Sequence, residues 1–345
     1  MKPNPTDGVH EEALERLHTT GPERDESLSN HAPMVVEALT AHGHSPAVHR
    51  WLDRYRDHLE EFPARHSTVT EDNWRRALGD SRRAADWIDF FDRTLAERPW
   101  REVLATWWPH LLPGIAGGAT HPVIRVGHAV RALRADEIAG PDARPAAPRV
   151  TELAHGLGYW AARHHPVAVS SVAAPSRAAV ALDQVPPVLD ASGGFATRLA
   201  RISRLPDWAG AVGAPEQAER HLRELVAATT HRYASHGHGR PVMLVHAATA
   251  PNAVLRALPA LPHALWAPSL VAAWTASATV TAAYPTAEPV TPRTSPRLLA
   301  EEVFERALRH GDEHAVKFTD TALDVGDPLA LTAALRSLEI IDPLE

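Results

Sequence analysis

Apolar residues recur along most of this chain at three- and four-residue spacing, which is the period of an amphipathic helix. The spacing is clearest in segments 47–62, 85–97, 216–233 and 297–310. Sustained alternation of apolar and polar residues, the pattern of a half-buried strand, is hard to find. The best strand candidate, WTASATVTAAY at 274–284, fits a buried helix equally well. The pattern therefore predicts an all-α fold.

Three proline-rich stretches, 137–149, 183–195 and 284–296, interrupt the helical pattern. Proline cannot continue a helix interior, so we interpret these stretches as connections between helices. No repeat of solenoid length is present. We expect one compact multi-helix assembly over residues 1–345, with a candidate boundary between two lobes near residues 140–150.

Charge and composition exclude several classes of protein. The net charge is −7 and no basic block is present, which argues against nucleic acid and anionic membranes as partners. No apolar run reaches the roughly 18 residues of a membrane-spanning helix, and the N-terminus lacks the apolar core of a signal peptide. The absence of cysteine rules out disulfides, thiolate metal sites and iron–sulfur clusters. We expect a soluble, cytoplasmic protein.

Lysine is almost absent from the chain. Of 35 basic Lys and Arg residues, only Lys2 and Lys317 are lysines. A position that keeps lysine against this bias can require a compact amine that is able to lose its proton, which arginine cannot supply. Lys317 is therefore a candidate functional residue.

Common catalytic motifs are missing. The sequence contains no H-E-x-x-H zinc motif and no G-x-S-x-G nucleophile elbow. Residues 156–161 (GLGYWA) loosely match a dinucleotide fingerprint, but they do not follow a predicted strand, so we do not expect a nucleotide site there.

Several of the 22 histidines lie in apolar surroundings or at predicted helix starts. His31 stands shortly before Pro33, and His121 directly before Pro122, both typical of helix entry. His128 follows His121 by two helical turns, so the two imidazoles could share one ion. His246 ends an apolar run, where a buried imidazole needs a hydrogen-bond partner or a metal. Any one of these histidines alone is more often a core or capping residue than a ligand.

His314 and Lys317 share one face of a helix that Asp312 is expected to cap. Neutral imidazoles suit Fe(II), Zn or Cu. A buried lysine with a lowered pKa can take up carbon dioxide and become an anionic carbamate, which would add the oxygen ligand that the histidines lack. The alternative is a surface lysine that pairs with Asp312, Glu313 or Asp320.

Five segments of the chain, in order, resemble the questin oxidase-like family. They are LSNHAPM (28–34), ALGDSRRAADWIDFFDRTL (77–95), WWPHLLPGIAGGATHPVIRVGHAVRAL (107–133), LVHAATAPNAV (244–254) and DEHAVKFTDTALD (312–324). The resemblance implies an oxygenase that opens the quinone ring of an anthraquinone-like aromatic polyketide with O2, by a Baeyer–Villiger-type or dioxygenase-type cleavage. It also implies non-haem iron held by histidines and a carboxylated lysine. NADPH use is compatible with the family, although no motif here supports it.

Carried over by position, the resemblance implies His31, His121, His128 and Lys317 as catalytic metal ligands. The fourth histidine is either His246 or His314, and the motif does not choose between them. Two alternatives remain at this point: a zinc-dependent hydrolase or lyase, and a non-catalytic helical protein that binds a polyketide. The ten tryptophans could line a pocket for flat rings, but most are expected in the core.

Overall fold

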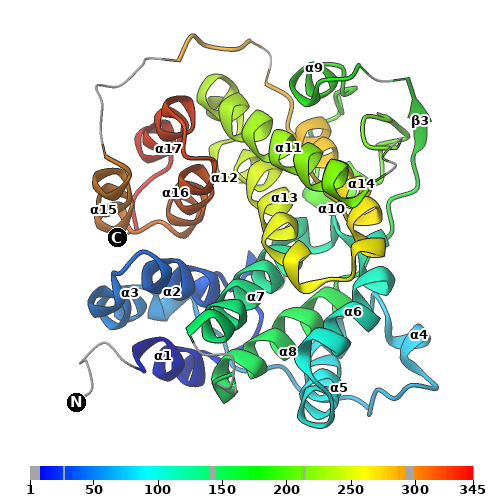
Figure 1. Cartoon of the computed structure of the whole chain (residues 1–345), viewed down its shortest axis with the longest axis vertical. Helices are drawn as coiled ribbons and strands as arrows, with labels where there is room; N and C mark the ends of the chain where they lie inside the picture. Colours follow the sequence, from blue (N-terminus) through cyan, green and yellow to red (C-terminus); the bar gives the residue numbers. More distant parts are fainter. Residues whose placement is uncertain are drawn as a thin grey trace.

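The computed structural model describes residues 8–25, 28–139, 145–173, 175–210, 212, 214–286, 288–292 and 299–344, and it confirms the all-α prediction (Figure 1). Within these residues, strands form only two small pairs. β1 (Glu23–Arg24) pairs antiparallel with β2 (Leu28–Ser29), and β3 (Ser170–Val172) pairs parallel with β4 (Arg204–Pro206). The ambiguous segment 274–284 lies almost entirely in a helix, so its helical interpretation is correct.

The α-helices follow one another along the chain with connections of very different lengths. Their bounds are α1 Val9–Leu17, α2 Ala32–Ala41, α3 Val48–Tyr55, α4 Trp74–Ala77, α5 Ala84–Glu97, α6 Trp100–Leu111, α7 His121–Ala139, α8 Ala147–Ala162, α9 Ala178–Asp183, α10 Phe195–Leu199, α11 Pro215–His236, α12 Pro241–Leu244, α13 His246–Ala257, α14 Trp266–Ala283, α15 Ala300–His310, α16 Glu313–Val325 and α17 Pro328–Ile340.

The helices form because their apolar residues fall on one face. In α3, the buried residues Val48, Trp51, Leu52 and Tyr55 repeat at three- and four-residue intervals. The largest core lies among α5, α6, α7, α8, α13 and α14, and its fully buried residues include Trp87, Trp108 and Trp160. These three tryptophans are core residues, as expected for most of the tryptophans.

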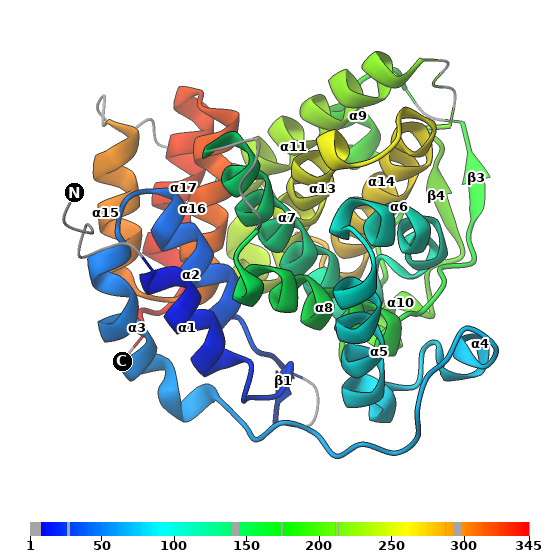
Figure 2. The same ribbon diagram turned by 60° about the horizontal axis from the view of Figure 1, so that its bottom comes forward.

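A separate core joins the two ends of the chain. Leu14 of α1, Val36 of α2 and Trp51 of α3 pack with Phe304 of α15 and Val316 of α16. Figure 2 shows the blue N-terminal helices beside the orange and red C-terminal ones. Residues near both ends of the sequence can therefore contribute to one site.

Four helices from distant parts of the chain close a ring. α2 contacts α7, α7 contacts α13, α13 contacts α16 and α16 contacts α2. No helix among the described residues is long and apolar enough to cross a membrane. Residues 140–144, at the start of the predicted lobe boundary, lie outside the described residues, so that boundary stays a prediction.

Candidate metal centre

The starts of these four helices carry four histidines. His31 is the residue directly before α2, His121 and His246 are the first residues of α7 and α13, and His314 is the second residue of α16. The predicted cap of α16 is confirmed, since the Asp312 side chain accepts hydrogen bonds from the backbone N–H of His314 at 3.0 Å and of Ala315 at 2.8 Å. Prolines near the starts of α2 and α7 favour helix entry there.

The four imidazoles lie against one another. Ring centroids are 4.7 Å apart for His31 and His121, 4.5 Å for His31 and His314, 4.4 Å for His121 and His246, and 5.5 Å for His246 and His314. One ring nitrogen each of His31, His121 and His314 lies within 4.8 Å of the others. The sequence leaves open whether His246 or His314 is the fourth histidine ligand. In the structure both rings belong to the cluster, so both remain candidates.

Backbone carbonyls fix the tautomers of His121 and His246. The Nδ1 of His121 is 2.7 Å from the carbonyl of Gly118, and the Nδ1 of His246 is 3.0 Å from the carbonyl of Met243. A carbonyl only accepts, so each Nδ1 carries the proton and each Nε2 presents a lone pair. These two Nε2 atoms are 2.8 Å apart. Two bare lone pairs at this distance repel unless a cation lies beside both.

His31 is oriented by a carboxylate. Its Nδ1 is 3.2 Å from Oε1 of Glu313, and its Nε2 is buried without a hydrogen-bond partner in the described part of the chain. A carboxylate that holds the far nitrogen of an imidazole is the usual outer partner of a metal-bound histidine. The Nδ1 of His314 lies 3.8 Å from one carboxylate oxygen of Asp312 and 3.8 Å from one of Glu313.

Burial keeps these imidazoles neutral. It lowers the pKa of His31, His121 and His246 well below the ordinary value of 6.5, and the positive charges of Lys317 and of the neighbouring imidazoles lower it further. The neutral form is the one that binds a metal ion. His31, His121 and His246 are thus ready to ligate at neutral pH.

Lys317 lies among the histidines and is only 1% exposed. Its Nζ has no hydrogen-bond partner among the described residues. Burial lowers its pKa to about 8, against the opposing charges of Glu313 and Asp312. The interpretation of Lys317 as a surface residue in an ion pair is therefore wrong. A buried amine without a partner is costly as a cation, and its neutral form is much more accessible than that of an ordinary lysine.

A left-handed turn precedes His121. Gly118 (φ 56°, ψ 33°), Ala119 (φ 52°, ψ 39°) and Thr120 (φ 69°) all have positive φ. For residues with a Cβ this conformation costs roughly 1–2 kcal/mol each, and it is especially unusual for a β-branched residue. The turn aims the Gly118 carbonyl at Nδ1 of His121. Such strain persists where the surrounding structure enforces it, most often at functional sites.

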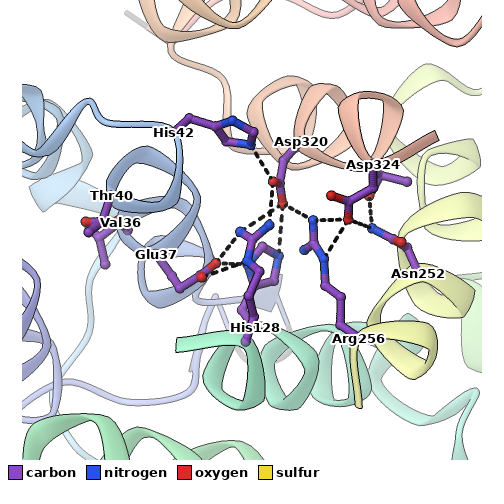
Figure 3. Close-up of polar contacts among 11 residues, drawn as sticks. Val36, Glu37, Thr40, His42, His128, Asn252, Arg256, Asp320 and Asp324 are labelled. Atoms are coloured by element: carbon purple, nitrogen blue, oxygen red, sulfur yellow. Dashed lines mark hydrogen bonds and ion pairs between the residues drawn. The ribbon is translucent and has the colours of Figure 1, made fainter. Parts of the chain in front are cut away.

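His128 lies outside this cluster, contrary to the expectation that it shares an ion with His121. Its Nδ1 is 2.6 Å from Oε2 of Glu37, and its Nε2 faces Asp320 at 4.0 Å (Figure 3). The helical spacing does return His128 to the side of α7 that carries His121. Two turns along the helix, however, place it about 10 Å away, where carboxylates from α2 and α16 engage both of its nitrogens.

The structure adds two residues to the site that the sequence pattern does not identify. The sequence suggests Glu313 only as a partner for Lys317, whereas in the structure it contacts His31. Tyr159 of α8 is fully buried. Its hydroxyl oxygen is 2.7 Å from Oγ of Ser29, which lies two residues before His31 in the sequence. A Cβ at Gly118 would also meet that hydroxyl at 3.4 Å. The sequence signal for Glu313 was its place beside His314; Tyr159 gave none.

The donor set fits a transition-metal ion. Among the described residues, no side chain or backbone N–H donates to the Nε2 atoms of His31, His121 and His246, and His314 adds a fourth imidazole. Imidazole nitrogens suit iron, zinc or copper, whereas magnesium and calcium prefer oxygen. The lysine supplies an oxygen ligand only after carboxylation.

A comparison with protein families supports the resemblance. The family model described as Questin oxidase-like matches residues 28–139. This segment runs from β2 to the end of α7 and contains His31, His121 and His128, while His246, His314 and Lys317 lie beyond it. No curated protein matches the chain.

Proposed function

We propose that this chain, which matches the questin oxidase-like family over residues 28–139, is a non-haem iron oxygenase that cleaves a C–C bond of an anthraquinone-like aromatic polyketide. The family supports an oxygenase of polyketide metabolism. The observation that carries the metal dependence is the pair of lone-pair-bearing Nε2 atoms of His121 and His246, which are 2.8 Å apart. The buried amine of Lys317, which has no hydrogen-bond partner among the described residues, adds to it.

In this proposal, His31, His121, His246 and His314 hold the ion together with Lys317. The neutral amine of Lys317 attacks the carbon of CO2, so that an N–C bond forms, one C=O π bond breaks with its electron pair moving to oxygen, and one N–H proton passes to water. The product is a carbamate, so a cation that repels a metal ion becomes an anionic oxygen ligand. When bound, Fe(II) would supply the binding and reduction of O2.

The protein residues provide a dry and oriented site. Gly118, Met243 and Glu313 hold the outer nitrogens of three imidazoles, so the rings keep their orientation when the ion is absent. The positive ends of four helices point at the cluster, which favours anions there, including a phenolate of the substrate. Burial of the cluster excludes bulk water from the reacting atoms.

Labelled oxygen gas tests the reaction. The iron-loaded protein, supplied with a hydroxyanthraquinone or its reduced form under 18O2, should consume oxygen and give a ring-opened benzophenone-type acid or a lactone that carries the label. Turnover that takes label only from H218O would replace the oxygenase with a metal hydrolase. Binding without turnover, by a protein that holds no metal, would leave only a polyketide-binding role.

A further inference from the structure

The four helices that carry the histidines are joined a second time by polar side chains, of which Glu37, His128, Asn252 and Asp320 are buried. We call this set the clasp. Its members are Glu37 of α2, His128 and Arg131 of α7, Asn252 and Arg256 of α13, Asp320 and Asp324 of α16, and His42 just after α2 (Figure 3). The metal proposal leaves all of them without a role.

The clasp repeats the order of the histidines at an offset of six or seven residues along each helix. Glu37, Asn252 and Asp320 each follow the histidine of their helix (His31, His246 and His314) by six residues, and His128 follows His121 by seven. At 1.5 Å per residue, the clasp lies about 9–10 Å further along each helix. The bundle thus holds two polar layers in the same four helices, with the imidazoles at one level and the clasp at the other.

Asp320 is the centre of the clasp. Its Oδ1 is 2.8 Å from Nη1 of Arg131 on α7 and 2.8 Å from Nε2 of His42, and its Oδ2 is 2.8 Å from Nη2 of Arg256 on α13. The carboxylate is fully buried. These partners all come from outside α16, so the contacts fix its position against its neighbours rather than support the helix itself.

Glu37 completes the ring from α2. It accepts from Nε of Arg131 at 2.8 Å and from Nδ1 of His128 at 2.6 Å. On the opposite side, Nδ2 of Asn252 donates to Oδ2 of Asp324 at 2.8 Å. A shift of any of these helices by one residue would move a side chain by 1.5 Å and 100° and leave a buried charge without its partner, which is strongly unfavourable.

We infer that the clasp is a positioning device for the metal centre: it fixes the rotation and height of α2, α7, α13 and α16 so that the four imidazoles stand at ligating distance before an ion arrives. The inference rests on the proposed metal centre. It also assigns His128 to positioning, through Glu37, rather than to ligation.

Cobalt(II) titration of the untagged protein tests the inference, because the visible spectrum of Co(II) reports ligand geometry independently of turnover. Asp320→Asn and the milder His128→Ala should fold, still bind one ion at saturation, bind it about 10-fold or more weakly, and give an altered spectrum. The matched control is Asp86→Asn on α5. Asp86 is a buried carboxylate paired with Arg83 and with the backbone N–H of His66 and Ser67, outside the four helices.

The control should lower the melting temperature and leave the cobalt affinity and spectrum unchanged. Folded clasp variants with wild-type affinity and spectrum would overturn the inference while leaving the metal centre intact. Complete loss of the ion in His128→Ala at saturating cobalt would instead make His128 a ligand. A wild-type protein that binds no cobalt would contradict the metal centre itself, and the clasp would then have nothing to position. If Asp320→Asn does not fold, His128→Ala decides.

Discussion

Lys317 is the residue on which the chemistry of the proposed centre depends, because it is the only lysine among the described residues. Its amine is buried and unpartnered in the described structure, and its pKa is lowered to about 8. Lys317→Arg keeps the positive charge but cannot form a carbamate, since arginine stays protonated. We expect this variant to lose metal binding altogether.

Metal titration measures that loss, and incorporation of 13C-bicarbonate followed by carbon NMR should reveal a carbamate signal in the wild type only. The control is the same substitution at the other lysine, Lys2→Arg, which should change neither readout. Full metal binding by Lys317→Arg would show that the lysine is not a ligand.

Ala119 tests whether the left-handed turn positions His121. Glycine tolerates positive φ, so Ala119→Gly should retain the metal affinity and change the free energy of unfolding by no more than about 1 kcal/mol. Valine is β-branched and resists this conformation, so Ala119→Val should displace the Gly118 carbonyl and weaken metal binding about 10-fold.

Isothermal titration with a divalent metal compares these two variants with Gly8→Val. Gly8, which precedes α1, also has positive φ (88°), and a Cβ there meets nothing within 4 Å. This control should lose stability but keep its metal affinity. Equal affinity of Ala119→Val and the wild type would show that the turn does not position the ligand.

Single residues also show where sequence reasoning ends. The helix starts at His31 and His121 and the Asp312 cap follow from local signals, namely proline position and a capping carboxylate, and all are present in the structure. The position of His128 could not be predicted, because helical spacing gives its side of α7 but not the carboxylate that a distant helix presents to it.

At the scale of elements, the clasp predicts a specific dependence on acid. Burial alone would raise the pKa of Glu37, but Arg131 and His128 lower it below its ordinary value of 4.5. The unfolded chain therefore takes up a proton at this carboxyl near pH 4.5, while the folded chain does not. The stabilisation is fully present above that pH and is lost as the pH falls toward the folded-state pKa.

Glu37→Gln removes this titration. The variant should be less stable than the wild type at neutral pH, because Arg131 loses one of its two carboxylate partners, and its stability should fall less steeply between about pH 5 and pH 3. Urea unfolding of the metal-free protein across that range measures both effects. Parallel pH profiles for the two proteins would contradict the assignment of Glu37 to a stabilising ion pair.

The spacing of apolar residues predicts which segments are helical and roughly where each helix begins and ends. It does not predict which other helices each helix contacts. The heptad-like burial of α3 is visible in the sequence, whereas the ring of α2, α7, α13 and α16 brings together segments almost 300 residues apart. The pairing of Arg131 with both Glu37 and Asp320 is a property of that ring. No local pattern specifies it.

At the scale of the whole molecule, the proposed ion would tie the two ends of the chain together. His31 belongs to the N-terminal segment and His314 to the C-terminal one, and both segments share a core. Metal binding should therefore stabilise the protein globally. At a free metal concentration 100 times the Kd, the gain is about 2.7 kcal/mol, which corresponds to an increase in melting temperature of several degrees.

Calorimetry of the protein with and without a chelator measures this increase. Lys317→Arg should melt at the same temperature in both conditions, since it has no ion to lose. A wild-type melting temperature that does not respond to the chelator, in protein shown to contain metal, would mean that the ion does not link the two terminal segments.

The central claim is that the four histidines and Lys317 hold one transition-metal ion. Elemental analysis of the chain, purified without chelators and without a polyhistidine tag, tests it most directly. We predict close to one iron per chain. Protein that contains no transition metal and takes up none when Fe(II) is supplied anaerobically would contradict the account.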